Sequence, residues 1–272
     1  MKNLLKVLCL FILSVSLFVC TSCGEDDPKV ITIGASPSPH AEILEQTRSY
    51  IESQGYTLEI KEFVDYIIPN TLTEEGTLDA NFFQHEPYLI DFNQSNGTNL
   101  VSVLKVHYEF LGLYKGKTKN LENIRSGSTI GVPNDTTNFS RACLLLQDLG
   151  LIAVDESKGL NLTLNDITDN PYDLKIQPAE AASLPRLLSE FDFAVINGNY
   201  ALSNGLTKND IIATESAEGD APTTYVNILV VKAGNEESEK IKVLIEALQQ
   251  PNIEEYINAH YQGVVEVYKG DN

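Results

Sequence analysis

Short strand-like segments alternate with helix-like segments along most of this chain of 272 residues. The strand-like segments are apolar or alternate in polarity, and amphipathic stretches separate several of them. Such alternation is typical of helices packed on sheets of mostly parallel strands, so we expect an α/β fold with mainly parallel sheets. The expected strands are residues 30–36, 57–64, 78–83, 100–106, 128–133, 174–178, 191–197 and 226–232, and the expected helices are 40–54, 137–149, 181–189 and 241–248.

Two stretches interrupt this alternation. Residues 113–120 and 214–224 are rich in polar and charged residues and contain glycine, which favours loops. We expect the chain to cross between two halves at these places. Ligands of such α/β proteins lie in the crevice between the halves.

Residues 1–22 have the three zones of a secretory signal peptide. A start with two lysines precedes the apolar residues 7–19, and small residues follow. The apolar run is shorter than the roughly 20 residues that a transmembrane helix needs.

Cys23 is the expected lipid acceptor, because Ser22 before it is small whereas Val19 before Cys20 is bulky. The stretch resembles a relaxed lipobox, with Cys20 where Leu is more usual. The alternatives are an ordinary signal peptide cut nearby and an uncleaved hydrophobic anchor. We expect residues 23–29 to be a lipidated tether, and the protein to be a membrane-anchored lipoprotein facing the periplasm or the cell exterior.

Composition and motifs exclude several classes of function. The net charge of −19 disfavours nucleic-acid binding. The chain has no GxSxG, GxxxxGK[ST] or HExxH motif, and His40, His85, His107 and His260 stand isolated without metal-ligand spacing. We therefore expect a protein that is not an enzyme and holds no metal and no cofactor.

Cys143 is the one cysteine left once the signal peptide is removed and Cys23 is lipidated, so we expect no disulfide. It shares one helix face with Phe139, Ala142 and Leu146. This spacing favours a thiol packed in the core over a nucleophile.

Four segments carry candidate binding residues. In 79–89, Phe82, Phe83, His85 and Tyr88 lie at the end of a strand and could hold an apolar side chain; the alternative is that one Phe fills the core and His85 caps the next helix. In 133–147, Thr136 or Thr137 is expected to cap a helix that carries Arg141. The guanidinium of Arg141 could bind a carboxylate; the alternative is that Arg141 is a solvated surface residue. Asn197 ends a strand and suits a zwitterion or a turn, and Asn227 interrupts an apolar strand and bonds a ligand or a neighbouring loop.

Together these segments resemble the methionine-binding lipoproteins, the NlpA family of methionine ABC importers, from about Val30 to the C-terminus. The resemblance rests on the motifs GASPSPHAEIL, FVDYIIPN, LDANFFQHEPYL, VPNDTTNFSRACLLLQDLGLI, LPRLL, AVINGNYAL and YVNILVV, which occur in the family's order and spacing. Thr136 and Thr224 depart from the prolines that are usual there, which leaves the choice of ligand open.

The resemblance implies a periplasmic-binding-protein-like fold of two α/β lobes joined by a hinge. Residues 30–112 plus 228–272 would form lobe 1, and 113–227 would form lobe 2. Tyr66 and Phe83 would sandwich the thioether of methionine, and His85 would line the pocket. Arg141 would clamp the carboxylate, and Asn197 and Asn227 would bond the amino and carboxylate groups.

The resemblance also implies a function. The chain would capture methionine and pass it to a membrane permease with a cytoplasmic ATPase. Other hydrophobic amino acids or methionyl dipeptides are alternative ligands. A metal-binding transport lipoprotein and a periplasmic enzyme are alternatives from other classes; the first needs clustered metal ligands and the second a nucleophile beside a base.

Substitution of Cys23 by Ala tests the lipid anchor. We expect Cys23→Ala to release the protein from the membrane fraction with its ligand binding intact, because the lipid holds the protein at the surface and takes no part in the pocket. Fractionation followed by titration calorimetry measures both properties. A folding or binding defect in the variant would contradict this role.

Overall fold

The computed structural model describes residues 27–216, 220–261 and 263–270. The expected signal peptide, Cys23 and the first part of the tether lie outside the described residues. None of the helices in these ranges is long and apolar enough to span a bilayer.

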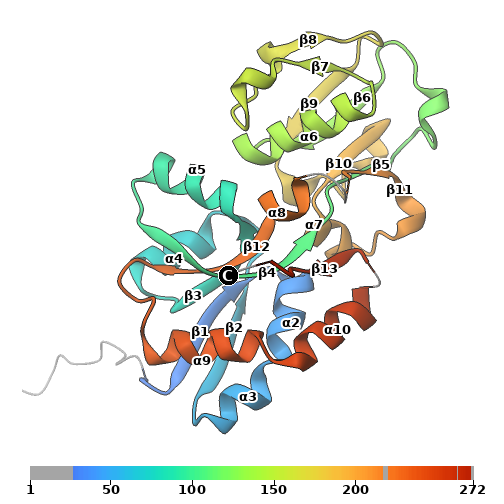
Figure 1. The fold of residues 1–272 in the computed structure, drawn as a ribbon. Coiled ribbons are helices and arrows are strands. Elements are labelled where there is room, and N and C mark those ends of the chain that lie inside the picture. The colour runs from blue at the N-terminus through green and yellow to red at the C-terminus, as the bar shows by residue number, and fades with distance from the viewer. Residues whose placement is uncertain (1–26, 217–219, 262, 271–272) are drawn as a thin grey trace, which may run out of the picture.

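The chain forms two α/β lobes, each built on its own sheet (Figure 1). The first sheet has the strand order β13-β4-β12-β3-β1-β2, and its strands are β1 (Val30–Ala35), β2 (Thr57–Glu62), β3 (Ala80–His85), β4 (Leu100–Glu109), β12 (Val226–Lys232) and β13 (Val265–Val267). The second has the order β11-β5-β10-β6-β9, and its strands are β5 (Gly112–Lys115), β6 (Thr129–Pro133), β9 (Lys175–Ala179), β10 (Phe193–Ile196) and β11 (Ile211–Thr214). A small pair, β7 (Ala153–Val154) and β8 (Ile167–Asp169), lies at the outer end of the second lobe (Figure 1).

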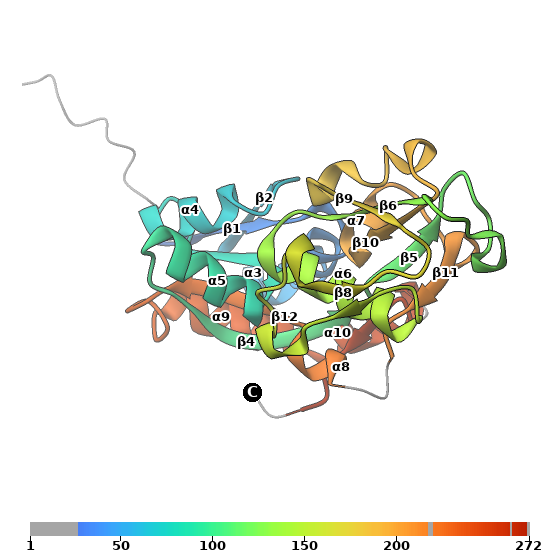
Figure 2. The ribbon, with the colours of Figure 1, turned by 90° about the horizontal axis from the view of Figure 1, so that it is seen from above.

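Helices cover both faces of the first sheet (Figure 2). One face packs on α2 (Glu42–Glu45), α3 (Arg48–Ser53), α9 (Glu239–Leu248) and α10 (Pro251–Tyr261), and the other on α4 (Ile68–Glu75) and α5 (Glu86–Asn96). In the second lobe, α6 (Thr136–Asp148) packs on the sheet, and α7 (Gly198–Ser203) follows β10. The remaining short elements are α8 (Ala221–Thr224), η1 (Pro37–Ala41), η2 (Leu121–Asn123), η3 (Glu156–Lys158), η4 (Leu164–Asp166), η5 (Ala181–Ser183), η6 (Leu188–Glu190) and η7 (Lys208–Asp210).

The expected α/β fold of two lobes is confirmed, but both sheets are mixed and not mainly parallel. In the first sheet β1 pairs in parallel with β2 and β3, but β12 runs antiparallel to β3 and β4, and β13 to β4. In the second sheet β5 pairs antiparallel with β10 and β11. The antiparallel strands β4, β5, β11 and β12 are those that carry the chain from one lobe to the other and back.

The helix expected at 40–54 is largely present, but a turn at Gln46–Thr47 divides it into α2 and α3. The expected helix 181–189 is two single turns, η5 and η6. The eight expected strands are present, whereas β5, β7, β8, β11 and β13 were not predicted because they are short and only partly alternating.

The two crossovers lie side by side. The chain leaves β4 at Glu109 and enters β5 at Gly112, so residues 113–115 belong to the second sheet and not to the first crossover. It returns between Thr214 and Val226, which places Val226 and Asn227 in the first sheet. Glu215 joins the crossovers, since its Oε1 accepts hydrogen bonds from the Leu111 backbone N–H at 2.8 Å and from the Tyr108 hydroxyl at 2.7 Å.

Cys143 lies in the apolar core of the second lobe, as its helical spacing predicted. It is fully buried and packs with residues of α6 and β6. Burial raises the pKa of its thiol to about 12, so the thiol stays protonated and unreactive at neutral pH.

We expect Cys143→Ser to lower the free energy of unfolding by about 1–2 kcal/mol, because a buried hydroxyl needs a hydrogen-bond partner that the apolar cluster lacks. Cys143→Ala is the matched control, since it removes the sulfur without adding a polar group. Urea unfolding followed by circular dichroism gives both values. A serine variant as stable as the wild type would show that Cys143 does not pack in an apolar environment.

Candidate ligand-binding site

A pocket lies between the two lobes and beside the crossovers. Its atom-free space, which includes space open to solvent, is about 340 Å³, and the cavity that a water molecule could occupy is only about 20 Å³. Only part of this space is wide enough for a water molecule, so a ligand has to move side chains apart on entering. Its lining residues are Tyr66, Phe83, Gln84, His85, Tyr88, Glu109, Asn138, Arg141, Asn197, Gly198, Asn199 and Asn227, which include all six positions predicted from the sequence.

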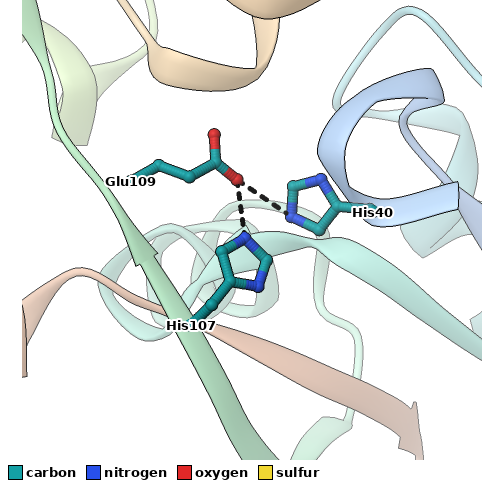
Figure 3. A group of neighbouring side chains, drawn as sticks. All are labelled: His40, His107 and Glu109. Carbon is teal, nitrogen blue, oxygen red and sulfur yellow. Dashed lines mark hydrogen bonds and ion pairs between the residues drawn. The ribbon is translucent and has the colours of Figure 1, made fainter. Parts of the chain in front are cut away.

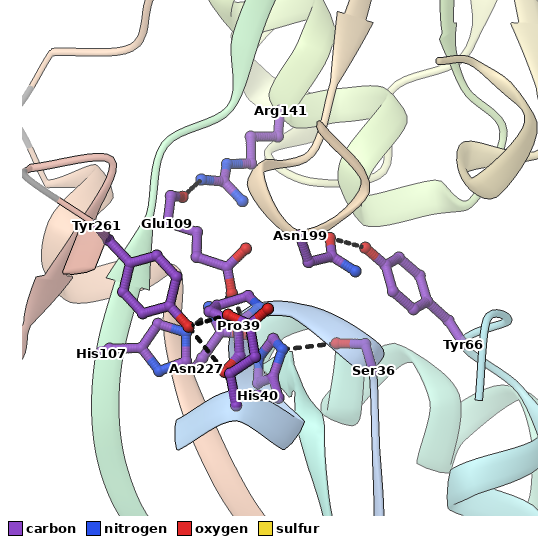
Figure 4. Close-up of polar contacts among 11 residues, drawn as sticks. Ser36, Pro39, His40, Tyr66, His107, Glu109, Arg141, Asn199, Asn227 and Tyr261 are labelled. Atoms are coloured by element: carbon purple, nitrogen blue, oxygen red, sulfur yellow. Dashed lines mark hydrogen bonds and ion pairs between the residues drawn. The ribbon is translucent and has the colours of Figure 1, made fainter. Parts of the chain in front are cut away.

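Aromatic rings form the wall contributed by the first lobe. Tyr66 and Phe83 lie with ring centroids 5.6 Å apart, and Tyr88 packs edge-on against both. Tyr66 also stacks on Tyr200 of the second lobe at 4.8 Å. Its hydroxyl donates to Asn199 Oδ1 at 2.7 Å, so this ring connects the two lobes (Figure 4).

His85 satisfies both interpretations of its segment. As the N-cap residue of α5 it accepts, through Nδ1, a hydrogen bond from the Tyr88 backbone N–H at 3.2 Å. Nε2 then carries the hydrogen and lies 3.2 Å from Asn138 Oδ1 across the cleft. Burial, followed by the charge of Arg141, lowers the pKa of His85 to about 3, so the ring is neutral. Phe82, next to Phe83, fills the core.

Arg141 is buried in α6 rather than solvated. Nε donates to Glu215 Oε2 at 2.9 Å and Nη2 donates to Glu215 Oε1 and to the Glu109 carbonyl. Tyr225 lies over the guanidinium at 4.1 Å. Burial opposes the charge of Arg141, but the charge of Glu215 outweighs it and raises the pKa. These bonds involve Nε and Nη2, so the Nη1 edge is the one that can meet a carboxylate in the pocket.

The start of α6 supplies a second polar group to the pocket. Asp135, and not Thr136 or Thr137, caps the helix, because its carboxylate accepts from the Asn138 backbone N–H at 3.0 Å. The Asn138 side chain also donates to Asp135, at 2.8 Å. Asn138 Oδ1 is therefore turned toward the cleft, where Asn197 Nδ2 donates to it at 2.8 Å.

The two predicted asparagines meet the pocket in different ways. Asn197 begins α7 without capping it by its side chain, and its Oδ1 is buried with no partner among the described residues. Asn227, in β12, has its Oδ1 2.9 Å from His40 Nε2. The sequence also allowed a purely structural role for each asparagine, in a turn or toward a neighbouring loop. In the structure both line the pocket.

His40 and His107 are not isolated in space, contrary to the sequence expectation. Their rings lie 4.9 Å apart, and the Nε2 atoms are 3.3 Å and 2.8 Å from Glu109 Oε1 (Figure 3). These three groups are close enough to be considered as metal ligands. However, 2.8 Å is a hydrogen-bond length, and His107 Nδ1, which would need an acceptor for its proton in a metal-bound ring, has no partner among the described residues.

Several pocket residues are not predicted from the sequence. Asn138 and Asn199 lie in the same motifs as the predicted residues Arg141 and Asn197, and no pattern distinguishes them. Glu109 had no signal, because a carboxylate at the end of a long alternating strand is usually solvent-exposed. Its burial became visible only in the folded structure.

Comparisons with known proteins agree with this geometry. The model of the NlpA lipoprotein family matches residues 31–267. The D-methionine-binding lipoprotein MetQ of Salmonella typhimurium is 38% identical over 247 residues, which cover 89% of this chain and 90% of the relative.

Solved structures share the fold. A nutrient binding protein from Burkholderia cenocepacia bound to methionine has a TM-score of 0.83 and 36% identity, covering 88% of this chain and 100% of that chain. A periplasmic substrate-binding protein of an ABC transporter from Coxiella burnetii has a TM-score of 0.81 and 32% identity over the same shares. Given the match over nearly all described residues, this chain belongs to the NlpA lipoprotein family.

Proposed function

We propose that this chain is the substrate-binding lipoprotein of an ABC importer. It captures methionine, with the D-isomer as a second candidate, and delivers it to a membrane permease driven by an ATPase. The observation that carries this proposal is the pocket between the lobes, where an aromatic wall faces a polar wall that holds one arginine. The similarity to a structure bound to methionine supports it.

The two walls suit the two ends of methionine. Tyr66, Phe83 and Tyr88 offer ring faces and edges, which make favourable contacts with a thioether sulfur. Arg141 offers the Nη1 edge to a carboxylate, and Asn197 and Asn227 add amide groups. A free amino acid fits this division, because it carries its charges at one end and its apolar group at the other.

A lipid on Cys23 would hold the binding protein at the membrane that contains its permease. β1 begins at Val30, so only a few residues separate that cysteine from the first strand. Such a tether keeps the two lobes close to a permease in the same membrane, which raises the effective concentration. We propose that the protein faces the periplasm or the cell exterior.

Three alternatives remain for test. Another hydrophobic amino acid or a methionyl dipeptide would use the same pocket. A metal-binding role is less favoured, because the cluster of His40, His107 and Glu109 has hydrogen-bond geometry.

An enzyme would need a nucleophile beside a base, and the fold does bring Ser36 Oγ to 2.6 Å from His40 Nδ1. Sequence spacing had not indicated this pair. His40 has no exposed surface, Ser36 is 3% exposed, and neither lines the pocket. The pair is therefore structural, with the hydroxyl donating to the ring.

Mass spectrometry of the protein purified without unfolding names the ligand, since such pockets often retain it. We expect the mass of methionine, and, after removal of the ligand, titration calorimetry should show heat with L-methionine. No heat with L-methionine, D-methionine or methionyl dipeptides would exclude the proposed ligand class.

Arg141→Ala should weaken methionine binding at least about 30-fold, because the ligand carboxylate loses its charged partner in a desolvated site. Arg141→Lys keeps the charge but loses the fork, so an intermediate affinity is expected. Arg125→Ala, at an exposed arginine, is the control. Near-wild-type affinity of a folded Arg141→Ala protein, measured by calorimetry, would remove Arg141 from the site.

A further inference from the structure

Glu109 is a buried carboxylate that the proposed function has not yet used. It ends β4 at the first crossover, is 5% exposed and lines the pocket. Figure 4 shows its carboxyl group between Arg141 on one side and His40 on the other. A buried carboxylate is costly unless it is paired, so its partners decide what it does.

Two imidazoles hold one oxygen of this carboxylate. His107 Nε2 lies 2.8 Å from Oε1, and His40 Nε2 lies 3.3 Å from the same atom while also contacting Asn227 Oδ1. Burial lowers the pKa of His40 to about 4 and of His107 to about 3, so both rings are neutral donors. They orient the carboxylate without neutralising its charge, and Oε2 points away from both rings (Figure 3).

The neighbouring cation is already paired. Arg141 forms a bidentate pair with Glu215, and it gives Glu109 only a hydrogen bond to the backbone carbonyl. Burial raises the pKa of the Glu109 carboxyl, although His40, the charge of Arg141 and a hydrogen bond from the Asn199 backbone all lower it. No arginine or lysine side chain among the described residues forms an ion pair with this carboxyl group. A cationic group in the pocket would supply a counter-ion.

A second unsatisfied acceptor lines the same pocket. Asn197 Oδ1 is buried without a partner, although its amide nitrogen is bonded to Asn138. An ammonium group has three donors and no acceptor, so it can serve a carboxylate and an amide oxygen at once. A ligand hydroxyl or a water offers at most two donors and no charge.

The backbone is shaped around this carboxylate. A Cβ added at Gly198 would lie 2.9 Å from Glu109 Cβ, which is closer than real Cβ atoms approach, and 3.0 Å from Glu109 Oε2. Glycine at the start of α7 therefore lets the second lobe approach Glu109 closely. The close approach brings Asn197 and Glu109 to one side of the pocket.

We propose that Glu109 binds the primary ammonium group of the ligand, and that His40 and His107 are positioning residues that hold its carboxylate for this contact. The inference rests on the proposed function and adds to it a requirement for a free amino group. It predicts selection of α-amino acids, or of peptides with a free N-terminus, over the corresponding carboxylic acids.

The test compares two ligands that differ only in the ammonium group. Titration calorimetry of ligand-free wild-type protein with L-methionine and with 4-(methylsulfanyl)butanoate measures the preference for the amine. We expect methionine to bind at least about 30-fold more tightly, the lower end of what a buried charge pair contributes. A preference below about threefold would overturn the inference without any variant, so the test does not depend on folding of a mutant.

Glu109→Gln assigns the preference to this residue. We expect the variant to lose at least about 30-fold in affinity for methionine and less than about threefold for 4-(methylsulfanyl)butanoate. Glu109→Asp keeps the charge and should retain part of the preference, and Glu255→Gln, which removes a charge from the exposed surface of α10, should change neither affinity. Equal losses for both ligands would make Glu109 a structural residue and overturn the inference.

Substitutions of His107 test whether this residue positions the carboxylate of Glu109. His107→Leu removes the donor to Oε1, whereas His107→Gln places an amide donor at a similar reach. We expect His107→Leu to reduce the preference for methionine over the desamino acid, and His107→Gln to restore part of it. Unchanged preference in a folded His107→Leu protein would contradict the positioning role.

Failure of the inference and failure of the proposed function give different results. Wild-type protein that binds neither methionine nor methionyl peptides rules out the proposed function, whatever the variants do. Wild-type protein that binds methionine, together with Glu109→Gln protein that binds it equally well, overturns the role of Glu109 alone.

Discussion

The buried pair between Arg141 and Glu215 holds the centre of this molecule together. Glu215 lies in the returning crossover and also accepts from Tyr108 and Leu111 in the outgoing one, so one carboxylate ties both connections to α6. Removal of either charge would leave the other buried and unpaired, which typically costs about 3–5 kcal/mol. The orientation of the two lobes and of the pocket between them depends on this contact.

The pocket's electrostatics follow from the same pair. Because Glu215 pairs with Nε and Nη2 of Arg141, the guanidinium gives Glu109 only a hydrogen bond to the backbone carbonyl, and burial raises the pKa of the Glu109 carboxyl. The buried residues His40, His85 and His107 are neutral, because burial lowers the pKa of each ring. A zwitterion suits such a site, since its carboxylate can meet Arg141 and its ammonium group can meet Glu109.

Local patterns predicted the elements that carry strong periodicity. The strands β6, β10 and β12 are buried on both faces, so each appears in the sequence as a continuous apolar run. The helix around Cys143 is buried along one face, so its apolar residues recur at helical spacing. The short edge strands β11 and β13 lack such a pattern. The helix expected at 181–189 is replaced by two short turns. Apolar residues of this segment pack in the core of the second lobe, but they do not repeat along one helix face.

The sequence by itself determined the α/β class and, through ordered motifs, the six positions that line the pocket. These properties depend on neighbours along the chain. Only the tertiary structure decided the mixed sheets, the cap at Asp135 and the cluster of His40, His107 and Glu109. The members of that cluster come from η1 and β4, and nothing in their spacing indicates that the fold brings them into hydrogen-bonding distance beside the pocket.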